Sequence, residues 1–207
     1  SLHTVNTDET ALISIRLGIA VVALSPIMLA IITNNRNELL NRLRFMSSHD
    51  PLTGVGNRAA FYAEAEKIFS THQTNAILML DLDNFKTIND NYGHAAGDVV
   101  LRETAQRISK CLRPADSMAR MGGEEFAVIL KGCTSNSAIT VAERLRESIA
   151  GLGFAVAPGQ TINVTTSVGI KVTQNTDELN IDTLLAEADH ALYRSKTNGR
   201  NRVELSE

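Results

Sequence analysis

Hydrophobic positions divide the chain into one long apolar run and, after it, shorter segments of helical or strand period. Residues 11–33, ALISIRLGIAVVALSPIMLAIIT, contain a single charged residue, Arg16. A helix of about 22 residues rises about 33 Å, which is enough to cross the hydrocarbon core of a bilayer, and membrane helices tolerate a proline such as Pro26. The run therefore predicts a transmembrane helix. A buried helix of a soluble protein is the alternative.

The charges that flank this run predict its orientation. Two acids precede it and three arginines follow it: Asp8, Glu9, Arg36, Arg42 and Arg44. Positively charged flanks remain on the cytoplasmic side of a membrane. Residues 1–10 are therefore expected to be an extracytoplasmic flank, and everything after residue 33 is expected to be cytoplasmic.

Residues 34–48, NNRNELLNRLRFMSS, carry a short helical stripe. Leu39, Leu43 and Met46 recur at spacings of four and three residues, as they do on one face of a helix. We predict a helical linker here. It could pair two copies of the chain as a two-stranded stalk, or it could pack as a single helix on its own domain.

The pattern from residue 49 to residue 207 predicts one domain of mixed helices and strands. Apolar residues at helical spacing predict helices within 58–71, 101–112, 138–149 and 181–192. Short apolar or alternating runs predict strands at 76–82, 116–121, 124–130 and 162–170. Gly122 and Gly123 join the second and third of these strands as a hairpin. The order predicts an α+β fold in which helices pack on a sheet.

Composition narrows the function classes. The 207 residues are 43% hydrophobic, carry a formal net charge of −3, and include no tryptophan and only 4% aromatic residues. This is enough apolar material for a core, but it does not supply the aromatic platform of a single-strand-binding protein. Cys111 and Cys133 have no CxxC spacing, so free thiols are expected rather than a disulfide or a zinc site.

Four carboxylates stand directly at the ends of predicted strands. Asp81 and Asp83 end the apolar strand at 76–82, and alternation places both side chains on one face. Glu124 and Glu125 open the strand after the double glycine. If these strands are neighbours, three or four carboxylates converge and require a cation. Such hard oxygen ligands suit Mg²⁺, although either pair alone would also fit a solvated strand end.

Four motifs, taken in order, resemble those of one known family. They are HDPLTGVGNR at 49–58, DLDNFKTINDNYGHAAGD at 81–98, RMGGEEF at 120–126 and YRSKTNGRN at 193–201. Their order and spacing are similar to those of the GGDEF family, the diguanylate cyclases, with the signature in its GGEEF form. The resemblance covers residues 49 to about 205 and does not include the apolar run.

The resemblance implies a fold and a reaction. The family fold is a five-stranded, mainly antiparallel sheet wrapped by helices, similar to nucleotidyl cyclases and polymerase palms. The reaction joins two GTP molecules into the signalling nucleotide cyclic di-GMP and releases two pyrophosphates, with Mg²⁺ or Mn²⁺ as cofactor. The protein would then be a signalling enzyme anchored by residues 11–33 in a bacterial inner membrane. Its catalytic domain would be cytoplasmic, and no nucleic-acid partner is expected.

The resemblance also implies roles in catalysis and metal binding. Asp81, the backbone carbonyl of Leu82 and Glu124 would hold the metal. Glu125 would be the general base for the ribose 3′-hydroxyl, a role that Glu124 could share. Lys86 would contact the phosphates and stabilise the charge of the transition state.

Further residues would bind the nucleotide. Asn89 and Asp98 would bind guanine, because a carboxylate accepts two parallel N–H bonds that guanine presents and adenine does not. Lys196 and Arg200 would bind the phosphates. Four more residues would lie beside the substrate: Phe85, His94, Gly122 and Gly123. Taken singly, several of these residues would equally suit a helix cap or a helix C-terminus.

An RxxD sequence precedes the signature. RPAD, from Arg113 to Asp116, resembles the site at which cyclic di-GMP inhibits enzymes of this family, and Arg144 is expected to add a contact from a neighbouring domain. Its fixed offset from the signature favours this interpretation over an ordinary charged surface. Because each domain would bind one GTP, a homodimer is expected. A silent receptor of GTP or cyclic di-GMP, and a cyclase with a different dinucleotide product, remain alternatives.

Overall fold

The computed structural model describes most of the chain beyond residue 46. The described ranges are 47–70, 73–173 and 180–206, with isolated positions between residues 12 and 36. Two units divide the chain, Ser1–Phe45 and Met46–Glu207. The architecture below is that of the second unit.

The predicted N-terminal elements fall largely outside the described residues. This applies to the whole flank at 1–10 and to most of the expected membrane helix at 11–33 and of the linker at 34–48. Among the positions that are described, no helix is both long and apolar enough to cross a membrane.

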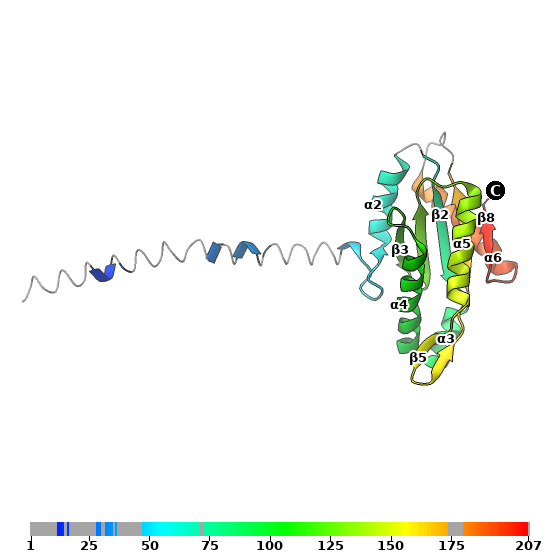
Figure 1. Ribbon diagram of the computed structural model, residues 1–207, viewed down its shortest axis with the longest axis horizontal. Coiled ribbons are helices and arrows are strands. Elements are labelled where there is room, and N and C mark those ends of the chain that lie inside the picture. The colour runs from blue at the N-terminus through cyan, green and yellow to red at the C-terminus, as the bar shows by residue number, and fades with distance from the viewer. Residues whose placement is uncertain are drawn as a thin grey trace, which may run out of the picture. The chain divides into compact units, whose positions relative to one another are not determined.

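A six-stranded sheet with the order β1-β3-β4-β2-β7-β8 forms the centre of the second unit (Figure 1). Its middle strand, β2 (Ala76–Leu82), pairs antiparallel with β4 (Glu125–Leu130) on one side and with β7 (Thr166–Val172) on the other. Strand β3 (Ser117–Gly122) pairs antiparallel with β4. All residues of β2 are buried, which accounts for its nearly unbroken apolar sequence.

The sheet has six strands and not the five expected. Strands β1 (Gly56–Asn57) and β8 (Val203–Leu205) run parallel to β3 and β7 and form the two edges. Strands this short show no period in a sequence. The strand predicted at 162–170 is also wrong in extent. Strand β6 (Gln160–Ile162) pairs with β5 (Phe154–Ala157) in a separate hairpin, and β7 begins only at Thr166.

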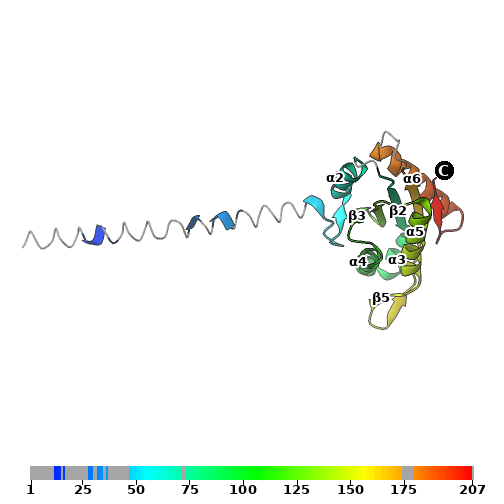
Figure 2. The ribbon, with the colours of Figure 1, turned by 45° about the horizontal axis from the view of Figure 1, so that its top comes forward.

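Helices cover both faces of the sheet (Figure 2). One face carries α3 (Phe85–Tyr92), α4 (His94–Cys111) and α5 (Ser135–Ala150), and the other carries α2 (Arg58–Phe69) and α6 (Ile181–Thr197). Side chains of β2 alternate between the two cores. Leu78 and Leu80 belong to the α3–α4–α5 core, whereas Ile77 and Met79 belong to the α2–α6 core. The middle strand therefore has no solvent face.

Arg107 of α4 fastens the hairpin β5–β6 to the end of α5. Its nearly buried guanidinium donates hydrogen bonds of 2.6 to 3.3 Å to four backbone carbonyls, those of Ser148, Ile149, Leu152 and Gly153. The same group lies 3.8 Å from the ring centroid of Phe154, and the Glu103 carboxylate balances its charge. One side chain thus satisfies a helix C-terminus that would otherwise leave carbonyls without donors.

Candidate active site

The register of β2 and β4 brings acidic residues together at one end of the sheet. Asp81 lies directly opposite Glu125 in the antiparallel pair, and the Leu82 amide donates to the Glu124 carbonyl at 3.4 Å. Residues that are more than forty positions apart in the sequence therefore meet because two apolar strands end at the same place. The adjacency of these strands, on which the predicted metal site depends, is present in the fold.

A lysine ammonium lies against the most buried of these acids. Asp81 is 7% exposed, and Lys196 of the last turn of α6 places its Nζ 2.8 Å from Asp81 Oδ2. Burial raises the pKa of Asp81 above its ordinary value. The hydrogen bond and charge of Lys196 oppose that shift, while the charges of Glu124 and Glu125 reinforce it. The three carboxylates therefore carry more negative charge than the Lys196 ammonium compensates.

The oxygen atoms at this end of the sheet fit a divalent cation. Among the described residues no group of three or more His, Cys, Asp or Glu side chains is arranged to hold a metal by itself. The predicted site needs only two carboxylates, those of Asp81 and Glu124, and the Leu82 carbonyl. Mg²⁺ keeps several water or phosphate ligands in such sites. A divalent cation would relieve the charge repulsion that Glu124 and Glu125 exert on Asp81, which the Lys196 ammonium offsets in part.

Asp83 does not join this cluster, contrary to the expectation that up to four carboxylates converge. Asp83 is 6% exposed, and its carboxylate accepts hydrogen bonds from the hydroxyls of Thr165 and Ser167 and from the Asn201 amide. These three donors come from β7, the residue before it and the loop after α6. Asp83 lies one residue beyond the end of β2, and these three donors compensate its charge.

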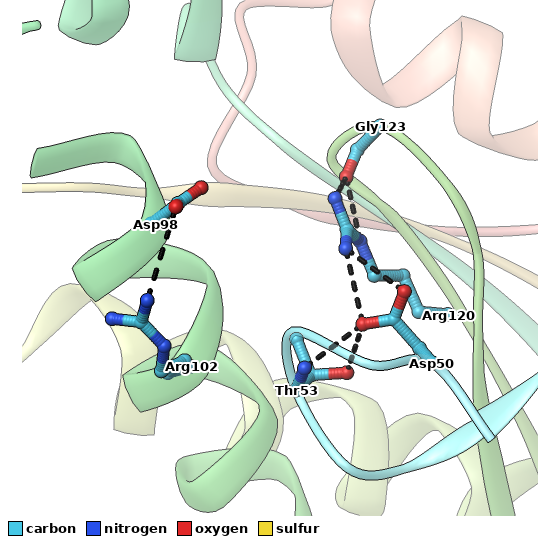
Figure 3. A network of polar contacts seen from close by, with 6 residues as sticks. All are labelled: Asp50, Thr53, Asp98, Arg102, Arg120 and Gly123. Atoms are coloured by element: carbon cyan, nitrogen blue, oxygen red, sulfur yellow. Dashed lines mark hydrogen bonds and ion pairs between the residues drawn. The ribbon is translucent and has the colours of Figure 1, made fainter. Parts of the chain in front are cut away.

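The predicted guanine-binding residues lie where α3 passes close to α4. A Cβ atom built on Gly97 would lie 2.0 Å from Asn89 Oδ1 and 3.1 Å from the ring of Phe85, so only glycine permits this approach. Asn89 is thereby held next to the turn of α4 that carries Asp98. Asp98 Oδ2 lies 3.8 Å from Arg102 across one turn of that helix (Figure 3). Phe85 is buried in the core beneath.

The remaining predicted nucleotide contacts are exposed around this region. His94 is the first residue of α4, and Lys86 lies in the first turn of α3. Gly122 ends β3, and Gly123 lies in the turn that leads to β4. Both are exposed, and Gly123 has a φ of 51°, which side-chain-bearing residues rarely adopt. Arg200 lies in the exposed loop that follows α6.

Arg120 fixes the turn that carries the two glutamates (Figure 3). Its Nε and Nη2 donate to the Gly123 carbonyl at 2.9 and 2.7 Å, and its Nη1 donates to both carboxylate oxygens of Asp50 at 3.0 Å. Asp50 also accepts from the amide and hydroxyl of Thr53. The peptide bond between Gly123 and Glu124 is therefore anchored to the segment that precedes α2.

The RxxD residues border a cavity at the end of the β3–β4 hairpin opposite its turn. Asp116 accepts hydrogen bonds from its own loop, from the Arg113 amide at 3.0 Å, and from the Lys131 amide at 3.3 Å. The cavity has a volume of about 290 Å³, and Cys133 lines it beside both residues. Burial, together with the nearby Asp116 carboxylate, raises the pKa of the Cys133 thiol to about 11. Arg144 donates to the Cys111 carbonyl at 2.6 Å and caps α4; its predicted contact with a neighbouring domain stays a prediction.

Comparison with known proteins decides the family. The model of the family described as "Diguanylate cyclase, GGDEF domain" matches residues 47–202. The chain belongs to the GGDEF domain family. Cyclases of this family generally use divalent metal ions.

Relatives and solved structures agree with this assignment of the GGDEF domain. Diguanylate cyclase A of Treponema denticola is 42% identical over 185 residues, which are 86% of this chain and 48% of that protein. The crystal structure of the coiled coil and GGDEF domain of DgcB from Caulobacter crescentus, in complex with c-di-GMP, is 29% identical with a TM-score of 0.79 and covers 85% of this chain and 94% of that one. The active GGEEF domain of a diguanylate cyclase from Vibrio cholerae is 31% identical with a TM-score of 0.62, covering 72% and 90%.

The chain is shorter than the curated proteins that it resembles. It spans about half the length of the first two relatives, and between 16% and 61% of the five. The activity and partners of those whole proteins are therefore matters for proposal here.

Sequence reasoning missed the supporting residues of the GGDEF domain. Asp50, Thr53 and Arg120 all lie in motifs that were recognised, but no role was predicted for them. The sequence shows an acid, Asp50, in one motif and a base, Arg120, in another. It does not indicate that these two side chains pair. The roles predicted for the metal, guanine and phosphate contacts stay predictions.

Proposed function

We propose that the chain condenses two molecules of GTP into cyclic di-GMP and releases two molecules of pyrophosphate. The observation that carries this proposal is the pairing of Asp81 with Glu125 across neighbouring strands, with the ammonium of Lys196 on Asp81. Membership of the GGDEF domain family supports it, as do the names of the relative from Treponema denticola and of the active GGEEF domain from Vibrio cholerae.

The carboxylates and one carbonyl at this end of the sheet suit Mg²⁺, with Mn²⁺ as a substitute. Asp81, Glu124 and the Leu82 carbonyl are the residues that would hold the ion. When bound, a divalent cation neutralises charge on the triphosphate and on the oxygens of the transferring group. Lys196 pairs with Asp81, and its ammonium would also lie within reach of the triphosphate.

Other side chains accept the proton of the attacking hydroxyl and stabilise the negative charge on the phosphates. Glu125 accepts the proton of the attacking ribose 3′-hydroxyl, a role that Glu124 could share from the adjacent position. Lys86, Lys196 and Arg200 place positive charge around the triphosphate and stabilise the departing pyrophosphate.

Guanine is selected between α3 and α4. The Asp98 carboxylate accepts the parallel N–H groups of the base, and the Asn89 amide adds a second contact. Gly97 holds this arrangement because it lets the Asn89 side chain lie against the backbone of α4. Arg102 lies 3.8 Å from the Asp98 carboxylate across one turn of α4.

A complete reaction needs two copies of the domain, since each supplies one GTP. We therefore propose a homodimer, at least during catalysis, with the linker at 34–48 as a coupling element. Activity that stays proportional to enzyme concentration at high dilution, in protein shown to be monomeric, would contradict it. Residues 11–33 are proposed to anchor the enzyme in the bacterial inner membrane. Recovery of the expressed chain in the soluble fraction after cell lysis would exclude that anchor.

Product inhibition is proposed at the cavity beside Arg113 and Asp116. The DgcB structure was solved in complex with c-di-GMP, which shows that a related domain binds the product. An initial rate that does not change when cyclic di-GMP is added would remove this part of the proposal. Arg113→Ala should relieve the inhibition without changing the uninhibited rate.

The decisive experiment is incubation of the 207-residue chain with GTP and Mg²⁺, followed by chromatographic separation of the products. Glu125→Gln should abolish cyclic di-GMP. Glu66→Gln, the same change on the exposed side of α2, should not. Failure of the parent chain to form product, although it binds GTP and dimerises, would refute the cyclase proposal and favour a silent receptor.

A further inference from the structure

The loop that carries Arg200 has two successive residues in the left-handed region of backbone conformation. Arg200 has a φ of 57° and the next residue, Asn201, has a φ of 45°. Residues with side chains rarely adopt this left-handed region, and two in succession persist only where surrounding contacts hold them. The groups that bond to this loop therefore determine where the Arg200 guanidinium can reach.

Asp83 bonds directly to this loop. Its Oδ2 accepts the Asn201 amide at 3.1 Å and the Thr165 hydroxyl at 2.6 Å, and its Oδ1 accepts the Ser167 hydroxyl at 2.7 Å. A carboxylate that is 6% exposed is stabilised only if such donors compensate its charge. The three donors join the end of β2, the start of β7 and the loop after α6 at one point.

A second contact holds the same loop from α5. Arg146 donates to the Asn201 side-chain oxygen at 3.0 Å, and Glu143 fixes the Arg146 guanidinium at 2.7 Å. Asn201 is therefore held through its backbone by Asp83 and through its side chain by Arg146. The other residue of the left-handed pair, Arg200, is held through its own amide, which donates to the Ser195 carbonyl at 3.0 Å.

We infer that Asp83 is a positioning residue for the nucleotide, and that it acts through the loop that carries Arg200. The two aspartates of the sequence DLD thus have different tasks. Asp81 faces the cation site and Lys196, whereas Asp83, two positions later, holds the phosphate-binding loop in its strained conformation. This inference rests on the proposed function, because it assumes that Arg200 contacts the triphosphate of GTP.

A double-mutant cycle on GTP binding tests the inference. We would measure the equilibrium affinity of the full chain for GTP in Mg²⁺ for the parent, Asp83→Ala, Arg200→Ala and the double variant. Each single change should weaken binding about tenfold, the size expected for a charge-assisted hydrogen bond. The double variant should also lose only about tenfold, because Asp83 acts through Arg200. A loss of about a hundredfold in the double variant would show independent effects and overturn the inference.

Two further variants distinguish positioning from metal binding and from loss of folding. Asp83→Asn keeps one acceptor for the Asn201 amide, so it should retain GTP affinity within a few-fold. If Asp83→Ala does not fold, Arg146→Met removes the other contact and should weaken GTP binding in the parent but not in Arg200→Ala. Binding of Mn²⁺ in the presence of GTP, followed by electron paramagnetic resonance, should survive Asp83→Asn and be lost with Asp81→Asn. Loss of Mn²⁺ in the Asp83 variant would assign Asp83 as a ligand and refute its positioning role.

The result separates this inference from the cyclase proposal. A parent chain that binds GTP without forming product contradicts the proposed function, yet the cycle on binding still measures the coupling between Asp83 and Arg200. A parent chain that binds no GTP contradicts both.

Discussion

Gly97→Ala should damage guanine binding through a single added methyl group. The new Cβ would lie 2.0 Å from Asn89 Oδ1 and 3.1 Å from the Phe85 ring, whereas ordinary contacts lie at 3.4–4 Å. The Phe85 ring is buried in the core and has little room to yield. The Asn89 side chain must therefore withdraw by more than about 1 Å, which exceeds the tolerance of a hydrogen bond.

The expected loss follows from the bonds that Asn89 would make. One hydrogen bond to a base contributes about 1–1.5 kcal/mol net, so losing its geometry weakens GTP binding about tenfold. Crowding in a packed contact costs about 1–3 kcal/mol of unfolding free energy. Titration calorimetry with GTP and urea denaturation followed by circular dichroism would measure the two effects separately. The KM for GTP should rise more than kcat falls, because the change affects binding of the base and not the reacting atoms.

Asn89→Ala provides the matched control. It should weaken GTP binding by a similar factor, and Gly97→Ala added to it should cause little further loss, because the group that the methyl displaces has gone. The reasoning is refuted if folded Gly97→Ala binds GTP within twofold of the parent, or if its effect is the same with and without Asn89.

Three other predictions concern stability. Burial alone would raise the pKa of Asp50, but hydrogen bonds from Thr53 and Arg120 outweigh it and hold that pKa below its ordinary value. Its stabilisation is therefore present above about pH 4 and is lost as the pH falls through the lowered pKa. Asp50→Ala should cost about 2–3 kcal/mol at pH 7 and less in acid, and a pH-independent difference in urea midpoints would contradict this. Mg²⁺ at a hundred times its Kd should raise the unfolding free energy by about 2.7 kcal/mol, reversibly with EDTA. A thermal melt of Asp81→Asn should show no such gain, and an equal gain would exclude Asp81 as a ligand. Arg107→Met should cost about 3–4 kcal/mol, and a loss below about 1 kcal/mol in urea denaturation would show that its carbonyl contacts are dispensable.

The sequence predicted those elements whose hydrophobic pattern extends over several turns or alternations. The apolar run at 76–82 is β2, and the helix predicted to begin at Arg58 does so, with Asn57 as its cap. Helix α3 was not predicted because only Phe85 and Ile88 are buried along it, which is too few to define a face. The edge strands β1 and β8 were missed because they are too short to show a period, and pairing with a neighbouring strand is what makes them strands.

The candidate site divides in a similar way. Asp81 and Glu124 could be proposed because each acid abuts an apolar strand within a recognisable motif. The hydrogen-bond partners of Asp83 could not be proposed from the sequence, because Thr165 and Ser167 are more than 80 positions away and Asn201 is 118 positions away. The ion pair between Lys196 and Asp81 likewise depends on how α6 packs against the sheet. Contacts of this kind follow from tertiary packing, and one sequence carries no direct record of them.

The two short strands that close the sheet limit how copies of this domain can associate. Strand β1 offers two residues and β8 offers three, so an incoming strand could form only a few backbone hydrogen bonds at either edge. Long, uncovered edges are the usual template for aggregation, and short ones prevent it. If two copies associate as proposed, these edges give them little backbone on which to grow a continuous intermolecular sheet, and the contact between them would have to be made by side chains.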